Sequence, residues 1–410
     1  MRSEEPPRAG RLIGFLLLLA TAAAPAADRS EAIVVMISFD GFRHDYFDRF
    51  NASHFQRVAR EGARADGLIP VFPSKTFPNH LSIATGVRPG KHGIVDNVFY
   101  DRDRDKVFTL RDPDIVSDGT WYEAEPIWVA AELQGINTAA FFWVGSEAPI
   151  HGVQPKDWRE YDENIPNAQR VDTVLEWLDR PEASRPRLIM LYFSAVDTAA
   201  HRHGALSDQV QDAVKHVNRM LGRLLDGIEA RPAVRDRVHL ILVSDHGMAD
   251  VERYVTVPAP PIRPLRQFNR SAFVSMWFED VSPLGRYAEQ IRRDTGLEVI
   301  TRGDYPDWTS LNGSHRAPDM LVLGTPGTGV VLEARHHDEA IAATHGYRPV
   351  DPIMHGIFLA WGPRIRSGKR IPAFENVHIY PLVAELLGIQ PNPNIDGRGE
   401  VLHPILRAAP

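Results

Sequence analysis

The 410-residue sequence contains no cysteine. This absence excludes disulfide bonds and thiolate chemistry, so stability after export would have to come from the core and from bound metal. A basic excess is also missing: the formal net charge is −7, and there is no long run of lysine and arginine. Proteins that bind nucleic-acid polymers by bulk attraction need such an excess, so that class is excluded, and any phosphate group has to be recognised locally.

The rest of the composition is that of a globular protein. With 43% hydrophobic and 24% charged residues, the chain can form one large core or two ordinary cores. The sequence shows no internal repeat and no low-complexity tract.

The N-terminus has the pattern of an export signal. Arginines at positions 2, 8 and 11 flank or precede the apolar run "LIGFLLLLA", and the small residues Ala24, Pro25 and Ala26 follow it. A bilayer span needs about 20 apolar residues, more than this run supplies. We therefore expect residues 1–26 to be a cleaved signal peptide, with a retained anchor as the alternative. The mature protein is expected to be exported, periplasmic or secreted, with no stable membrane span.

Five short runs are apolar at consecutive positions, as strands are when a sheet is covered on both faces. They are "AIVVMISF" (32–39), "NTAAFFWV" (137–144), "RLIMLYFS" (187–194), "VHLILVS" (238–244) and "GIFLAWG" (356–362). The amphipathic stretches between them are expected to be helices, at 51–62, 167–180, 205–230 and 376–388. This alternation predicts an α/β fold with a mostly parallel central sheet sandwiched by helices.

Residues 251–344 break this alternation. They begin with the proline-rich "VPAPPIRPL" and then carry a strand of their own in "AFVSMWFED", a helix, and "DMLVLG". We expect this segment to be a smaller inserted subdomain. Residues 27–250 and 345–410 are expected to form the main core together.

Acidic residues and histidines gather where the predicted strands end, which is where open α/β sheets bind ligands. Taken singly, each would more commonly be a turn residue or a helix cap. Asp197 and His201 stand at positions i and i+4, so one helical turn can present both on one face. Three aspartates and three histidines are a suitable ligand set for two zinc-like ions. The six residues are Asp40, Asp197, His201, Asp245, His246 and His345.

The stretch "PSKTFPNH" (73–80) places a lysine, a threonine and a histidine around two prolines. Each proline fixes its own backbone angle and restricts the residue before it, so the segment is stiff. The following "FPNHLSIATG" is expected to be a helix, with Thr76 at its N-terminus, where backbone N–H groups favour an anion. A plain helix N-cap is the alternative role for Thr76.

Six motifs in this order resemble the nucleotide pyrophosphatase/phosphodiesterase family of the alkaline phosphatase superfamily. They are "ISFDGFR", "PSKTFPNH", "VDN", "VDTAAHRHG", "SDHGM" and "THGY". The resemblance extends from about residue 32 to 405. It implies an alkaline phosphatase-like core and two Zn²⁺ ions. One ion would be held by Asp197, His201 and His345, and the other by Asp40, Asp245 and His246. Thr76 would be the nucleophile and a further ligand of the second zinc.

The resemblance also implies hydrolysis of nucleotide phosphodiester or pyrophosphate bonds through a phosphothreonine intermediate. Asn97, in "VDNVFY", is similar to the family's asparagine that donates to a phosphate oxygen, and a turn role is its alternative. Phe77 and Tyr192 match aromatic positions that flank the base, although each is equally suited to a core or strand position. The expected partner is a small phosphodiester.

Three alternatives stay open. Family relatives also hydrolyse choline-phosphate lipids, and the aromatic pair does not exclude an acyl chain. A phosphate monoesterase or phosphonate hydrolase of the same superfamily would share the metal residues, but a monoesterase needs extra cationic groups that the sequence does not reveal. A non-catalytic exported binding protein is the alternative from another class, and the presence of Thr76 beside all six metal-ligand candidates disfavours it.

Overall fold

The computed structural model describes residues 31–269, 271–332 and 341–407. The expected leader at 1–26 lies outside these residues. Across the described ranges, no helix has the length and apolar character needed to cross a membrane.

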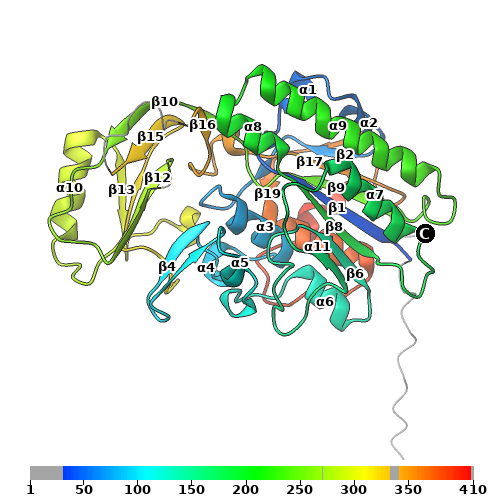
Figure 1. The fold of residues 1–410 in the computed structure, drawn as a ribbon, viewed down its shortest axis with the longest axis horizontal. Coiled ribbons are helices and arrows are strands. Elements are labelled where there is room, and N and C mark those ends of the chain that lie inside the picture. Colours follow the sequence, from blue (N-terminus) through cyan, green and yellow to red (C-terminus); the bar gives the residue numbers. More distant parts are fainter. Residues whose placement is uncertain (1–30, 270, 333–340, 408–410) are drawn as a thin grey trace, which may run out of the picture.

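An eight-stranded sheet forms the centre of the larger lobe (Figure 1). Its strands in spatial order are β18 (Lys369–Ile371), β2 (Ala63–Ala65), β17 (Phe358–Trp361), β9 (Val238–Val243), β1 (Ile33–Phe39), β8 (Leu188–Phe193), β6 (Thr138–Phe141) and β7 (Asp157–Arg159). Neighbouring strands run parallel except where β17 meets β9 and β2. The predicted α/β class with a mostly parallel sheet is therefore confirmed.

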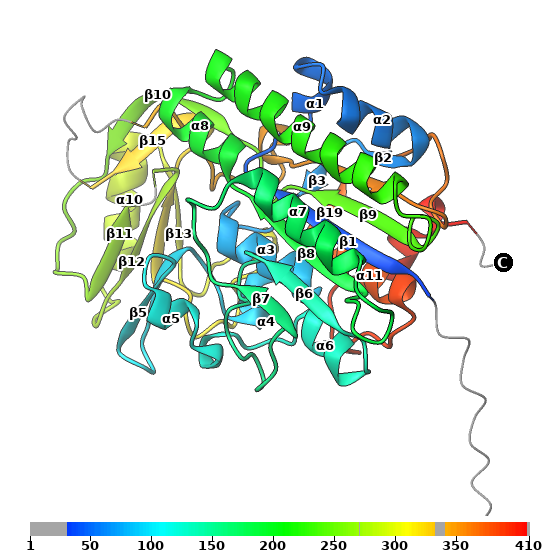
Figure 2. The same cartoon turned by 45° about the vertical axis from the view of Figure 1, so that its right-hand side comes forward.

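Helices cover both faces of this sheet (Figures 1 and 2). One face carries α1 (Tyr46–Arg49), α2 (Ser53–Glu61), α7 (Asn167–Leu178), α8 (Ala195–His203) and α9 (Asp208–Glu229); the other carries α3 (Thr76–Thr85), α6 (Ile127–Leu133) and α11 (Ile379–Leu387). Side chains of β1 alternate between the two faces: Val35 and Ile37 pack under α7 and α9, whereas Val34 and Met36 pack against α11. Since both faces are buried, all of β1 is apolar and buried except for the serine at position 38, which is polar but also buried.

The five expected strands are all present, within two residues of the expected bounds or as shorter segments inside them. The helices expected at 51–62, 167–180 and 205–230 are α2, α7 and α9, and the one at 376–388 begins with a short 3₁₀ turn, η5 (Asn376–His378), before α11. The strand at 356–362 differs in direction, since β17 is antiparallel to both neighbours. Burial on both faces produces the same apolar run for either direction, so the sequence pattern does not reveal the reversal.

The smaller lobe is built from two further sheets (Figure 2). One contains β10 (Ala249–Thr256), β15 (Gly327–Val331) and β16 (Ala343–Thr344); the other contains β11 (Arg266–Asn269), β12 (Phe273–Trp277), β14 (Met320–Leu323) and β13 (Glu298–Thr301). Helix α10 (Leu284–Thr295) packs on the second sheet around a separate apolar cluster that includes Tyr287 and Ile291. On this basis we propose that residues 251–344 are an inserted subdomain.

A β-hairpin of the larger lobe faces the smaller one. It consists of β4 (Val98–Asp101) and β5 (Lys106–Thr109), and it lies beside β11. Tyr100 packs edge-on against Trp277 of β12, with ring centroids 6.5 Å apart. The hairpin begins directly after Asn97, so contacts between the lobes bear on a predicted site residue.

Candidate metal centre

The six residues predicted as metal ligands come from four separate places in the chain and lie at one edge of the central sheet. Asp40 follows β1, and Asp245 and His246 follow β9. Asp197 and His201 lie on α8, which directly follows β8, and His345 follows β16. The parallel strands β1, β8 and β9 bring their carboxyl ends to the same edge, and β16 reaches it by pairing antiparallel with β10, the strand that follows His246.

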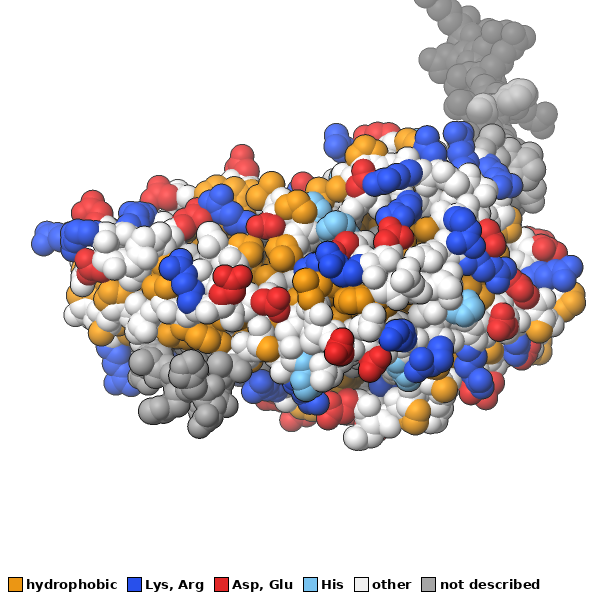
Figure 3. Space-filling view, turned by 90° about the horizontal axis from the view of Figure 1, so that it is seen from above, with side chains coloured by type: hydrophobic (Ala, Val, Ile, Leu, Met, Phe, Trp, Pro, Cys, Tyr) orange, Lys and Arg blue, Asp and Glu red, His pale blue; other side chains and the backbone are white. Residues whose placement is uncertain are grey.

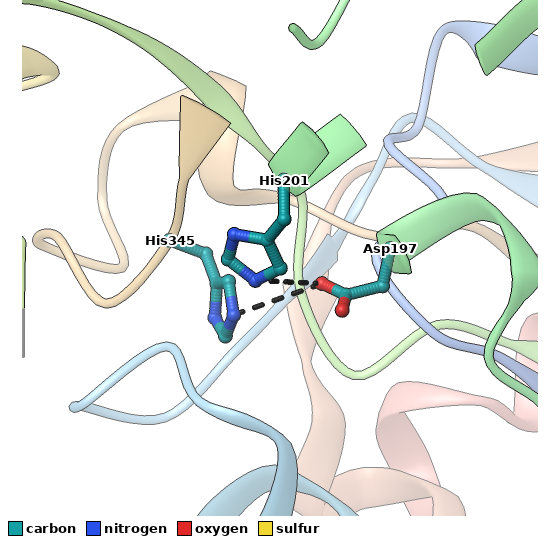
Figure 4. A group of neighbouring side chains, drawn as sticks. All are labelled: Asp197, His201 and His345. Carbon is teal, nitrogen blue, oxygen red and sulfur yellow. Dashed lines mark ion pairs between the residues drawn. The ribbon is translucent and has the colours of Figure 1, made fainter. Parts of the chain in front are cut away.

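The first group consists of Asp197, His201 and His345 (Figure 4). Both imidazole Nε2 atoms point at Asp197 Oδ1, at 3.4 Å for His201 and 3.7 Å for His345. The α8 helix provides the predicted i, i+4 spacing between Asp197 and His201.

The second group consists of Asp40, Asp245 and His246, all of them buried. His246 Nε2 lies 3.0 Å from Asp245 Oδ2 and 3.5 Å from Asp40 Oδ1. In each group the ligand atoms converge within 4.8 Å of one another.

The two groups adjoin. The rings of His246 and His345 stack with centroids 3.5 Å apart, and the backbone N–H of Asp197 donates to the carbonyl of Asp40 at 3.1 Å. Gly41 makes this approach possible: its φ is +65°, and a Cβ there would lie 2.9 Å from Cα of Asp197. Any larger residue at position 41 would push the two groups apart.

Backbone carbonyls orient all three imidazoles. Nδ1 of His201 donates to Ala343 O at 2.8 Å, that of His246 to Gly247 O at 2.9 Å, and that of His345 to Ser74 O at 2.7 Å. Because a carbonyl only accepts, Nδ1 carries the hydrogen in each ring. Each Nε2 then faces the carboxylates, as in histidines that bind metal.

Unpartnered polar atoms fit a pair of cations. Asp40 Oδ1, Asp197 Oδ1, Asp245 Oδ2 and His246 Nε2 are buried and have no hydrogen-bond partner among the described residues. Burial, followed by the charges of Asp245 and Asp197, raises the pKa of Asp40 well above its usual range. Burial and the neighbouring His246 hold the pKa of His345 well below its usual range, so this imidazole is neutral. Clustered carboxylates, the neutral imidazole of His345 and buried oxygens without a partner together fit divalent cations bound by nitrogen and oxygen.

A third group, Asp101, Asp103 and His315, has similar spacing but a different environment. Asp101 Oδ2 accepts from Arg316 Nε at 2.8 Å, and its Oδ1 accepts the backbone N–H of Asp103 at 3.0 Å. A guanidinium already neutralises this carboxylate, so the group is an ion-pair network.

Thr76 is the first residue of α3, and Lys75 occupies the N-cap position. The N-cap role considered for Thr76 is therefore wrong. His80 ties this turn to the metal centre: its Nδ1 bonds Thr76 O at 2.8 Å, its Nε2 bonds Ser38 Oγ at 2.8 Å, and Asp245 Oδ2 lies 3.6 Å from Nδ1. These contacts make His80 a link between Thr76 and Asp245.

Asn79 holds the segment before Thr76. Its side-chain amide accepts the Val71 N–H at 2.7 Å and donates to the carbonyls of Pro73 and Lys75 at 3.0 and 2.8 Å. Asn376 completes the set by donating to Asn79 Oδ1 at 2.9 Å. The two prolines are thus one part of what fixes this segment, and a fully buried asparagine is another.

Asn97 lies beside the start of α3. Its Oδ1 accepts the Phe77 N–H at 2.8 Å. Because the amide oxygen is occupied, the NH₂ end is the one left to meet a ligand. The ring of Phe77 packs edge-on against Phe108 at 5.8 Å and is 9% exposed, so one part of it belongs to the core.

Tyr192 is buried and its hydroxyl donates to Asp40 Oδ2 at 2.5 Å. The exposed aromatic nearby is Tyr161, which is 46% exposed, with its ring centroid 6.2 Å from that of Tyr192. Sequence reasoning missed Tyr161 because it lies in an irregular segment whose position depends on packing against Phe142.

Known proteins with a similar sequence or structure share most of this chain. Residues 34–348 match the family described as type I phosphodiesterase / nucleotide pyrophosphatase. A venom phosphodiesterase of Macrovipera lebetinus is 30% identical over 90% of this chain and 45% of its own length. Human ectonucleotide pyrophosphatase/phosphodiesterase family member 1 is 29% identical over 90% of this chain and 41% of its own length. The chain thus spans less than half the length of these curated relatives.

A solved structure has a similar fold over the whole of its own chain. It is an inactive threonine-to-alanine variant of murine ectonucleotide pyrophosphatase/phosphodiesterase 5 in complex with AMP. It is 25% identical, has a TM-score of 0.85, and covers 92% of this chain and 100% of its own.

Proposed function

Since the chain belongs to the type I phosphodiesterase / nucleotide pyrophosphatase family, we propose that it hydrolyses nucleotide phosphodiester or pyrophosphate bonds with two Zn²⁺ ions and Thr76 as nucleophile. The observation that carries this proposal is the pair of adjoining ligand groups, joined by the stacked rings of His246 and His345 and tied through His80 to the first turn of α3. Imidazole and carboxylate ligands in these ratios suit zinc, a borderline ion.

Thr76 needs assistance to act as a nucleophile, because its hydroxyl is protonated at neutral pH. Bound cations would supply the charge that lowers the pKa of this hydroxyl and that offsets the charge on the departing oxygen. Thr76 Oγ1 then attacks phosphorus, the bond to the leaving oxygen breaks, and a phosphate ester forms on Thr76. Attack of water on phosphorus breaks the Thr76 O–P bond and regenerates the hydroxyl.

Asn97 and α3 stabilise the phosphate during both steps. The hydrogen bond from the Phe77 N–H turns the Asn97 NH₂ outward, where it donates to a non-bridging oxygen. The N-terminus of α3 adds a partial positive charge at the same place, since α3 is a ten-residue helix that begins at Thr76.

Aromatic rings are proposed to select the nucleoside part. The AMP complex of the murine relative supports a nucleotide ligand. Phe77 supplies the exposed part of its ring beside Thr76. We assign the second stacking surface to Tyr161, which is 46% exposed, because the hydroxyl of Tyr192 is committed to Asp40. Tyr192 then acts by orienting Asp40.

We propose an exported protein that acts on small molecules. The names of the venom and ectonucleotide relatives support export. Basic and acidic side chains lie interspersed on the face shown in Figure 3, which disfavours attraction of a nucleic-acid polymer to that face.

A substrate panel tests the proposal. The purified protein is assayed with a nitrophenyl ester of a nucleotide, a nitrophenyl phosphate monoester and nitrophenylphosphocholine, with and without a chelator. We expect the nucleotide diester to be preferred, chelation to abolish turnover, and Zn²⁺ to restore it. Preference for the monoester would overturn the diesterase assignment, and preference for the choline ester would move the protein to lipid substrates.

Two variants at position 76 test the nucleophile. Thr76→Ala should lower kcat by at least about 10³-fold. Thr76→Ser retains a hydroxyl and is the matched control, expected to keep measurable turnover and to form a phosphorylated protein when quenched with acid. Activity in Thr76→Ala equal to that of Thr76→Ser would remove Thr76 from the mechanism.

A further inference from the structure

One arginine of the inserted segment is completely enclosed at the junction between the lobes. Arg316 is 1% exposed, although arginine is among the residue types least often buried. Its guanidinium makes four polar contacts: Nε donates to Asp101 Oδ2 at 2.8 Å, Nη1 donates to the carbonyls of Gly93 at 2.9 Å and Trp121 at 2.7 Å, and Nη2 lies 3.0 Å from Glu123 Oε1.

Two of the residues that Arg316 contacts lie on either side of Asn97 in the sequence. Gly93 precedes Asn97, and Asp101 ends the strand that begins just after it. One planar group therefore fixes both ends of the segment that carries Asn97. Gly93 permits the close approach: its φ is +81°, and a Cβ there would clash with Nη1 of Arg316.

Aromatic packing continues from Arg316 to α3. The guanidinium carbon lies 5.6 Å from the ring centroid of Phe99, which stacks on Phe108 at 5.0 Å. Phe108 in turn meets Phe77 edge-on at 5.8 Å. Arg316 thus supports Asn97 through the backbone and supports Phe77, the hydrogen-bond partner of Asn97, through the rings of Phe99 and Phe108.

We propose that Arg316 is a positioning residue that sets the placement of the Asn97 amide relative to Thr76. The inference rests on the proposed function, because it assigns Arg316 an effect through the phosphate contact of Asn97. The requirement for arginine is geometric. A lysine has one compact ammonium group and cannot reach Asp101, Gly93 and Trp121 in three fixed directions.

A double-mutant cycle on kcat tests the inference with the zinc-loaded, full-length protein. Asn97→Ala alone should lower kcat about 10²-fold, as loss of one oxyanion donor does. Arg316→Lys alone should lower kcat about tenfold with KM within threefold of wild type. In the Asn97→Ala background, Arg316→Lys should lower kcat less than twofold, because the group that it positions is gone.

Arg266→Lys is the matched control. Arg266 is an exposed arginine of β11. Its guanidinium lies over the ring of Tyr100, 5.0 Å from the centroid, and 3.8 Å from Asp105, both on the β4–β5 hairpin, and these contacts do not include Gly93 or Asp101. Its kcat should stay within twofold of wild type. Thermal unfolding of every variant separates loss of the fold from loss of positioning. If Arg316→Lys does not fold, Asp101→Asn removes one of the two charged partners of Arg316, the one next to Asn97, and enters the same cycle with the same expected result.

The outcomes are distinguishable. An equal loss of kcat in both backgrounds would mean that Arg316 acts independently of Asn97 and would overturn the inference, as would an Arg316→Lys variant with wild-type kcat. An Asn97→Ala variant with wild-type kcat, or a wild-type protein without diesterase activity, would instead overturn the proposed function.

Discussion

Two neighbouring tyrosines are expected to have different roles. Tyr192→Phe removes the hydroxyl that bonds Asp40 Oδ2, so it should weaken Zn²⁺ affinity about tenfold or more, measured by competition with a chromogenic chelator. Tyr161→Ala removes an exposed ring, so it should raise KM for a nucleotide diester about tenfold and leave Zn²⁺ affinity unchanged.

A diester without a nucleobase, such as bis(nitrophenyl) phosphate, is the control substrate for the tyrosines. Tyr161→Ala should hydrolyse it with wild-type KM. A larger rise in KM for the nucleotide in Tyr192→Phe than in Tyr161→Ala would return the stacking role to Tyr192.

A buried histidine away from the metal centre, His92, is expected to make the stability of the protein depend on pH. His92 is fully buried, its Nε2 bonds Ser82 Oγ at 3.0 Å, and burial lowers its pKa from 6.5 to about 3. Between these two values the unfolded chain binds a proton that the native protein does not, so the free energy of unfolding rises with pH. The stability that the neutral His92 contributes is fully present above pH 6.5 and is lost as the pH falls towards 3. At pH 5 the loss in the free energy of unfolding is about 2 kcal/mol.

Urea unfolding at pH 7.5 and pH 5.0 measures this pH-dependent part of the free energy of unfolding. His92→Gln should lose about 2 kcal/mol less than wild type between the two pH values. His203→Gln, at an exposed position on α8, is the control and should lose as much as wild type. An acid-induced loss in His92→Gln that matches wild type would contradict the assignment.

At the scale of elements, the segment 70–75 and helix α3 act as one unit because Asn79 joins them. Asn79→Ala would leave the Val71 N–H and two carbonyls buried without their partner. We expect a loss of about 3 kcal/mol in the free energy of unfolding and at least a tenfold loss in kcat, since Thr76 follows this segment directly.

Asn164→Ala, at an exposed turn position, is the control for Asn79 and should alter neither quantity. An Asn79→Ala variant that is less stable and yet turns over at the wild-type rate would show that the segment does not position Thr76.

Elements were predictable from sequence where both faces of a strand are buried. The runs at 32–39, 187–194 and 238–244 became β1, β8 and β9 because continuous apolar sequence suits the centre of a covered sheet. The direction of β17 and the partition of the smaller lobe into two sheets were not predictable. Both depend on which strands pair, and pairing is decided by tertiary packing that an apolar pattern does not encode.

At the scale of the whole molecule, the site depends on segments far apart in the chain. The six residues named from their motifs lie together in two groups. The parallel strands β1, β8 and β9 deliver five of them to one edge, and the antiparallel pairing of β16 with β10 brings His345 beside them. The roles proposed for Tyr161, His80 and Arg316 were not predictable from the sequence, since the placement of each depends on contacts with a distant segment.

The central claim is that the two groups bind a pair of Zn²⁺ ions beside Thr76. Anomalous diffraction at the zinc absorption edge, from crystals grown with Zn²⁺, tests it most directly. The account predicts two peaks about 4 Å apart, one among Asp197, His201 and His345 and the other among Asp40, Asp245, His246 and Thr76 Oγ1. A single peak, or two peaks with the Thr76 hydroxyl out of bonding distance of both, would contradict it.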